Sequence, residues 1–193
     1  MFCVNRIKNV KTEGWIKLTL TIALSVYSLI IANITNNVGI FIAMFFSTGG
    51  DISIMASRDA LGTGKDKNKF IKGVVFFAWA HFMYLLSMES IESKAWVVII
   101  GFQLLVVLII CFISYGMDLE SDMILNVFYA LCIFLATINA WIFSLLAGIG
   151  YLLFVTSDII LVIKEEKEPI WQIPIWAFYV AGQICIITSF LMV

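Results

Sequence analysis

The feature that most constrains this chain is a series of apolar runs, each long enough to cross a lipid bilayer as an α-helix. A spanning helix needs roughly 20 mostly apolar residues. Stretches of this kind cover residues 15–34, 38–55, 70–88, 95–115, 123–141, 145–163 and 173–193. The pattern therefore predicts an all-α, polytopic transmembrane helix bundle of about seven spans, with residues 15–193 forming a single transmembrane domain.

Charged residues are too scarce in this chain for a water-soluble fold. Only 13% of the 193 residues are charged and 62% are hydrophobic, whereas soluble domains carry about 25% charged residues. We therefore expect an integral, multi-pass membrane protein, which in a bacterium would lie in the plasma (inner) membrane. Residues 1–14 form a polar N-terminal segment, and the apolar run after them is too long for the core of a signal peptide. We expect that run to be retained as a helix.

The basic residues predict how the bundle is oriented. In a seven-span arrangement, every lysine and arginine except Lys94 lies on one side of the membrane. Cytoplasmic loops are enriched in these residues, so the N-terminus is expected inside and the C-terminus outside. The break between residues 141 and 145 has the weakest turn signal, because the sequence around it is almost continuously apolar. Lys17 lies just inside the first span and is expected to reach back to the interface.

Three ionisable residues, Asp51, His81 and Asp158, lie within the apolar runs. Such groups are costly in hydrocarbon unless they face a bundle interior or a wet cavity, and they commonly mark functional sites. The two aspartates lie at similar depth on segments that run in the same direction, so they are placed to share a cavity. Two carboxyl groups held close together can act as an acid and a base side by side. The alternative for each aspartate is a cap or an interhelical hydrogen bond near the interface.

Other polar residues in the spans are candidates for the same pocket. His81 is the only histidine, and Tyr84 lies three residues later on the same helical face. A lone buried histidine can equally be a structural residue whose hydrogen bonds are satisfied. Tyr179 and Gln183 also share a face, although interhelical hydrogen bonding would explain them, as it would Tyr129.

The sequence gives no reason to expect a cofactor, a metal ion or a nucleic acid. One histidine and no Cys-x-x-Cys motif leave only oxygen ligands, and the four cysteines show no paired spacing. The stretch Gly62-Thr63-Gly64-Lys65 lacks the first glycine of a phosphate-binding loop and the hydroxyl residue after the lysine. The basic residues between the second and third spans are better explained as a topology signal.

Four motifs in the spans resemble those of the YhhN-like integral membrane family, which includes the lysoplasmalogenases. They are Ser47-x-x-Gly50-Asp51, Gly73-x-x-x-Phe77-x-x-Ala80-His81-x-x-Tyr84, Gly150-x-x-x-Phe154-x-x-Ser157-Asp158, and the pair Tyr179 and Gln183. The resemblance runs from about Lys17 to the C-terminus. The family usually has eight helices, and with seven predicted spans we expect this chain to lack the first of them. It also has Leu18 where a proline usually follows the lysine.

The resemblance implies hydrolysis of the vinyl ether bond of a lysoplasmalogen, which yields a fatty aldehyde and a glycerophospho-ethanolamine or -choline. The substrate would be a lyso-ether phospholipid taken from the membrane. Asp51 and Asp158 would form an acid/base pair, with the order of their roles open, as paired carboxyl groups do in glycoside cleavage. His81 would orient the water or a carboxyl group. The supporting pocket residues would be Ser47, Tyr84, Ser157, Tyr179 and Gln183.

A carrier or binding protein for a small molecule or lipid is the main rival. Protonatable aspartates at matched depth could relay protons as well as catalyse. The second and sixth spans run in the same direction and each carries an Asp-Ile pair, which hints at the parallel repeat found in transporters. A homologue with a purely structural role is a third possibility. The head-group preference and the oligomeric state stay open.

Overall fold

The computed structural model describes residues 2–57, 66–88, 121–164 and 172–192, and these residues form six α-helices and no strand. The all-α class expected from the sequence is confirmed. The helices are α1 (Phe2–Thr35), α2 (Val38–Ser57), α3 (Lys67–Ser87), α5 (Ser121–Phe143), α6 (Leu145–Lys164) and α7 (Gln172–Ser189).

The helix boundaries agree closely with the predicted spans. The turn with the weakest signal falls at Ser144, whose hydroxyl accepts a hydrogen bond of 3.1 Å from the amide of Ala147 at the start of α6. Two ends differ from expectation. α1 begins at Phe2, so the polar N-terminal residues continue the first helix, and α7 ends at Ser189, short of the predicted end at residue 193. The predicted span at 95–115 lies outside the described residues.

Three of the described helices are long and apolar enough to cross a membrane, which is consistent with a membrane protein. The qualifying stretches are Trp15–Thr35, Val38–Ser57 and Asn68–Ser87. Shorter apolar stretches cover Val127–Phe143, Leu145–Leu161 and Ile173–Ser189. Large apolar side chains project outward from these helices, as lipid contact requires. Seven spans and the orientation of the termini stay predictions.

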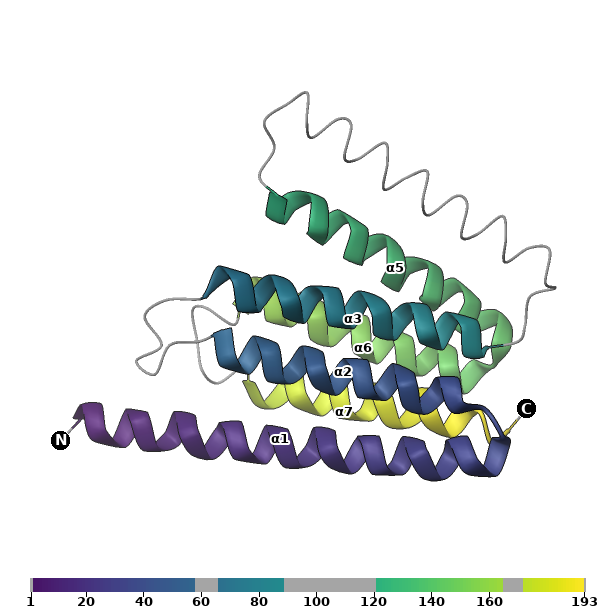
Figure 1. Cartoon of the computed structure of the whole chain (residues 1–193), viewed down its shortest axis with the longest axis horizontal. Coiled ribbons are helices and arrows are strands. Elements are labelled where there is room, and N and C mark those ends of the chain that lie inside the picture. Colours follow the sequence, from purple (N-terminus) through teal and green to yellow (C-terminus); the bar gives the residue numbers. More distant parts are fainter. Residues whose placement is uncertain (1, 58–65, 89–120, 165–171, 193) are drawn as a thin grey trace.

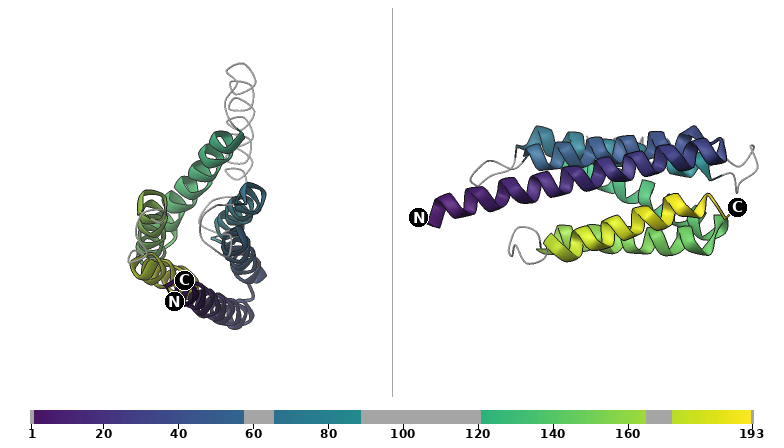
Figure 2. Two further views of the ribbon diagram at one scale, coloured as in Figure 1. Left: turned by 90° about the vertical axis from the view of Figure 1, so that its left-hand side faces the viewer. Right: turned by 90° about the horizontal axis from the view of Figure 1, so that it is seen from below.

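The described helices form a ring in which α1, α2, α3, α5, α6 and α7 pack in that order and α7 returns to α1 (Figures 1 and 2). The N- and C-terminal ends lie at opposite ends of this bundle (Figure 1). α2 and α6 run in one direction, and the other four helices run in the opposite direction. The two aspartate-bearing helices are therefore parallel, as the sequence predicts.

Glycines set the spacing of the helix pairs that carry the aspartates. A Cβ added at Gly182 would lie 2.8 Å from the carbonyl oxygen of Gly150, so α6 and α7 are in backbone contact at this point. A Cβ added at Gly73 would lie 3.2 Å from the carbonyl oxygen of Gly50, at the contact of α3 with α2. Small residues at such crossings let helices approach closely in a lipid environment.

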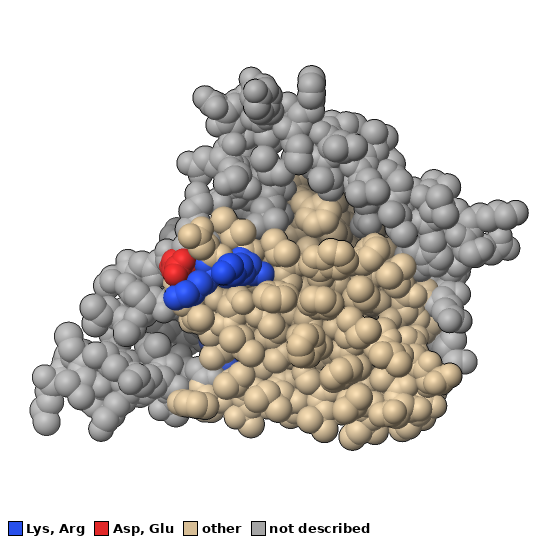
Figure 3. Space-filling view, viewed as in Figure 1, with Lys and Arg blue, Asp and Glu red and all other residues tan. Residues whose placement is uncertain are grey.

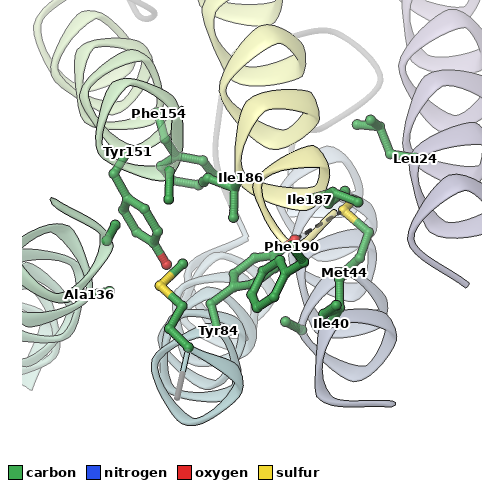
Figure 4. Close-up of a cluster of buried hydrophobic side chains, with 14 of the residues drawn as sticks. Leu24, Ile40, Met44, Tyr84, Ala136, Tyr151, Phe154, Ile186, Ile187 and Phe190 are labelled. Atoms are coloured by element: carbon green, nitrogen blue, oxygen red, sulfur yellow. Dashed lines mark hydrogen bonds between the residues drawn. The ribbon is translucent and has the colours of Figure 1, made fainter. Parts of the chain in front are cut away.

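A compact apolar cluster fills the end of the bundle where α2 and α6 begin and α7 ends (Figure 4). Its labelled members include Ile40, Met44, Tyr151 and Phe190, and Tyr84 contributes a hydroxyl 3.9 Å from the sulfur of Met44. These side chains come from α2, α3 and α6 and from Phe190, which directly follows α7. They are buried between the helices at this end.

Most of the charged side chains on the face shown in Figure 3 gather where α3 begins, and the described surface of this face is otherwise almost entirely uncharged. Asp66 caps α3, accepting a hydrogen bond of 3.2 Å from the amide of Lys69. The ammonium of Lys69 lies 3.2 Å from the same carboxylate. Hydrogen bonds from Lys69 hold the pKa of Asp66 below its usual value.

Candidate functional site

A cavity of about 130 Å³ lies toward the end of the bundle where α2 and α6 end, and Phe77 and Tyr179 of the apolar cluster form part of its wall. All six described helices contribute to its wall, mainly through the last turns of α2 and α6 and the first turns of α3 and α7. Only three of the lining residues carry an ionisable charge: Lys17, Asp51 and Asp158. The wall is otherwise largely apolar. The lining residues are Lys17, Asp51, Ile54, Met55, Phe70, Val74, Phe77, Tyr129, Ser157, Asp158, Leu161, Ile175, Trp176 and Tyr179.

Asp51 lies on α2 and is only 7% exposed. The hydroxyl of Tyr179 on α7 donates a hydrogen bond of 2.7 Å to its Oδ2 atom. The ring of Tyr179 is itself wedged among aromatic neighbours, with its centroid 5.2 Å from that of Trp176 and 5.4 Å from that of Phe154. The aromatic packing fixes the hydroxyl, and the hydroxyl in turn fixes one oxygen of the carboxyl group.

Asp158 lies on α6 and is half-buried. The hydroxyl of Tyr129 on α5 donates a hydrogen bond to its Oδ2 atom. Each aspartate of the cavity therefore receives one tyrosine hydroxyl from a different helix. A tyrosine donor stabilises a carboxylate in an apolar wall, where an unpartnered charge would be very costly.

His81 lies behind Tyr129 and is not among the residues that line the cavity. Its Nε2 atom is 3.5 Å from the Tyr129 hydroxyl, and its Nδ1 atom is 3.4 Å from the hydroxyl of Tyr151. Because the hydroxyl proton of Tyr129 is directed at Asp158, the oxygen of Tyr129 can accept a hydrogen bond from Nε2 in the tautomer that is protonated there. The ring also packs edge-on against Phe154, with the centroids 4.9 Å apart. His81 thus acts on Asp158 only through Tyr129.

Tyr84, Gln183 and Ser47 form a second buried group behind Tyr179. The hydroxyl of Tyr84 donates a hydrogen bond of 2.9 Å to the Oε1 atom of Gln183. The Nε2 atom of Gln183 donates a longer bond of 3.4 Å to the hydroxyl of Ser47. All three side chains are almost fully buried, and none lines the cavity.

The structure thus divides the predicted site residues into two groups. Asp51, Asp158, Ser157 and Tyr179 line the cavity, so the matched depth of the two aspartates does bring them to one pocket. The other predicted residues lie behind its wall: Ser47, His81, Tyr84 and Gln183.

Four side chains of the site were underestimated from the sequence. Tyr129 was explained as an interhelical hydrogen-bonding residue, yet its partner is a cavity aspartate. Tyr151 and Trp176 gave no signal beyond apolar packing and interfacial placement. Lys17 was expected to reach the interface, whereas its side chain is only 9% exposed and lines the cavity.

The described residues contain no group of three or more histidine, cysteine or acidic side chains placed to hold a metal ion. The chemistry available in the cavity is that of two carboxyl groups, tyrosine hydroxyls and one ammonium. These groups can transfer protons and position water within a wall that is largely apolar.

A ring of apolar helices around a cavity with paired carboxyl groups defines a helical membrane protein with a buried polar site. The chain belongs to the YhhN family, whose profile matches residues 13–190. No curated protein and no solved structure matches the chain.

Proposed function

We propose that this protein is a membrane hydrolase that cleaves the vinyl ether bond of a lysoplasmalogen. The products are a fatty aldehyde and a glycerophospho-ethanolamine or -choline. The observation that carries the proposal is that Asp51 and Asp158 line the same cavity, each accepting a hydrogen bond from a tyrosine hydroxyl. Membership of the YhhN family is consistent with a membrane enzyme of this kind.

The reaction needs only an acid, a base and water. The carboxylic acid of the pair gives its proton to the vinyl carbon that is not bonded to oxygen, which leaves an oxocarbenium-like cation. The carboxylate of the pair stabilises that cation and takes a proton from the water that adds to it. The resulting hemiacetal collapses to the aldehyde and the free glycerol hydroxyl. One water is consumed, and the acid is regenerated by proton transfer within the pair.

The tyrosines act as positioning residues in this scheme. Tyr179 fixes Asp51 and Tyr129 fixes Asp158, and each leaves the second carboxylate oxygen available for the reaction. His81 and Tyr151 orient Tyr129 from behind the wall. Catalytic groups gain rate when they are held in the reacting geometry before substrate arrives.

Apolar packing beyond the cavity, toward the ends where α2 and α6 begin, favours a hydrolase over a carrier. A carrier needs access to its site from both sides of the membrane in turn. Met44 and Tyr84 belong to a buried apolar cluster that extends from the cavity wall toward the ends where α2 and α6 begin. The parallel course of α2 and α6 is the one feature that favours the carrier.

The proposal is tested by replacing each aspartate with asparagine in purified protein. Asp51→Asn and Asp158→Asn should abolish aldehyde release from lysoplasmalogen while helical content and elution volume in detergent stay unchanged. Asp66→Asn is the matched control, because that aspartate caps α3 outside the cavity and an asparagine also caps helices. The saturated ether analogue should release no aldehyde with any variant. Full activity in both cavity variants would rule out the acid/base pair.

A further inference from the structure

Lys17 is a buried cation in the wall of the cavity. It lies on α1 and is 9% exposed, although Trp15 two residues earlier is 69% exposed. Lys17 lies near the start of the apolar stretch Trp15–Thr35, which is where a spanning helix is expected to pass from the headgroups into the hydrocarbon. A lysine here would ordinarily reach outward to the interface. Its burial instead places a positive charge in the cavity.

Aromatic side chains connect Lys17 to the carboxyl pair. Its Nζ atom lies 5.2 Å from the ring centroid of Trp176, within the range of a cation–π contact. Trp176 packs against Tyr179, which donates to Asp51. Lys17, Asp51 and Asp158 all line the cavity. The ammonium and the carboxyl pair therefore belong to one cavity, with two aromatic rings between them.

We propose that Lys17, held by Trp176, binds the phosphate of the lipid headgroup and makes the enzyme selective for lyso-phospholipids over phosphate-free alkenylglycerols. This inference rests on the proposed vinyl ether hydrolysis. Lysine binds phosphate as a point charge and needs no fixed planar geometry. A phosphodiester carries a single negative charge, which matches the single ammonium of the wall.

The arrangement of charge also orients the substrate. The phosphate is attracted to Lys17 and repelled by the carboxylate of the pair, so the two ends of the glycerol backbone cannot exchange places. With the phosphate at Lys17, the ether-bearing end of the glycerol extends along Trp176 and Tyr179 toward Asp51. The alternative role for Lys17 is that of a counterion to Asp51, and this role would affect every substrate equally.

Two substrates that differ only in the headgroup separate these roles. Purified protein in detergent is assayed with 1-alkenyl-glycerophosphoethanolamine and with the corresponding 1-alkenylglycerol. Loss of a charged hydrogen-bonding partner commonly costs a factor of about ten to a hundred. Wild-type kcat/KM should therefore be higher for the phospholipid by about that factor. Lys17→Met should remove this advantage mainly by raising KM for the phospholipid, so that the ratio of the two kcat/KM values falls to about one, whereas Lys17→Arg should restore most of the ratio.

A binding measurement gives a readout that does not depend on turnover. The radiolabelled saturated ethers, 1-alkyl-glycerophosphoethanolamine and 1-alkylglycerol, should bind wild-type protein with affinities that differ by a similar factor. The difference should disappear in Lys17→Met. Equal binding of both ethers by the wild-type protein would overturn the inference, as would an equal loss of both activities in Lys17→Met. Cleavage of neither alkenyl lipid would instead overturn the proposed reaction, and the binding data would still decide the role of Lys17.

Discussion

Tyr179 on α7 donates a hydrogen bond of 2.7 Å to the carboxyl group of Asp51 on α2. These two helices are not neighbours in the order of packing around the ring, so the bond spans the interior of the bundle. The donor ring is held by Phe77, Phe154 and Trp176. A carboxyl group fixed this way is prepared for its reaction before substrate binds, since neither partner has to reorganise.

Removing this hydroxyl should slow the reaction without unfolding the protein. Tyr179→Phe keeps the aromatic packing and deletes only the donor, so we expect kcat for vinyl ether hydrolysis to fall about tenfold or more. Tyr27→Phe is a close control, because Tyr27 makes a hydrogen bond of similar length, 2.8 Å, to Thr188 away from the cavity. That variant should keep its wild-type rate. Steady-state kinetics on both purified variants measure the difference.

The course of the chain follows well from the sequence because spanning length and turn residues determine it. The turn at Ser144 was predictable even in a nearly continuous apolar run, since a single helix cannot span that length. Asp51 and Asp158 were expected to share a pocket because their segments run in the same direction and place them at similar depth. The structure brings both to one cavity wall.

The partners of these aspartates could not be predicted in the same way. Contacts between helices depend on how each helix is rotated about its axis. A helix that is apolar on all sides, as α6 nearly is, gives little sequence signal for that rotation. The pairing of Tyr129 with Asp158 and of Lys17 with Trp176 depends on such rotations. The depth of each site residue along its helix was therefore predictable from the sequence, whereas the direction in which its side chain points around the helix axis was not.

The cap at the start of α3 should contribute a pH-dependent increment of stability. Hydrogen bonds from Lys69 lower the pKa of Asp66 in the folded protein. The contribution is therefore complete above the unfolded pKa of about 3.8 and is lost as the pH falls through the lower folded value. Thermal unfolding should show Asp66→Ala to be less stable than wild type at neutral pH. The two proteins should converge in acid, and a constant difference at all pH values would contradict this account.

Close packing of α6 on α7 should make Gly182 intolerant of a side chain. An added Cβ would lie 2.8 Å from the carbonyl oxygen of Gly150 and 3.0 Å from the amide nitrogen of Phe154, and backbone atoms cannot rotate away. We expect Gly182→Ala to destabilise the protein by about 1–3 kcal/mol, as overpacked sites do.

Gly49→Ala provides the comparison for this prediction. Its Cβ would make ordinary contact, at 3.5 Å, with the ring of Phe76. Alanine also stabilises a helix interior relative to glycine by about 0.5–1 kcal/mol. Unfolding in detergent should therefore show that Gly182→Ala is much less stable than the wild-type protein. Gly49→Ala should be as stable as the wild-type protein or more stable. Equal stability of the two variants would show that α6 and α7 separate at little cost.

His81 should influence catalysis only through Tyr129. Its Nε2 atom lies 3.5 Å from the Tyr129 hydroxyl, and it does not line the cavity. We expect His81→Asn to lower kcat several-fold in the wild-type background. The same substitution should have little further effect in Tyr129→Phe, because the hydroxyl that transmits it is absent. A double-mutant cycle on kcat measures this coupling.

Tyr84 gives the matched comparison for that cycle because it lies on the same helix, three residues after His81, yet bonds to Gln183 in the other buried group. Tyr84→Phe and Tyr129→Phe should therefore act independently, with effects on ln kcat that add within error. Residues in one hydrogen-bonded network are coupled, and separated ones are not. If His81→Asn instead lowered kcat by the same factor with and without the Tyr129 hydroxyl, the histidine would affect catalysis by a route other than Asp158.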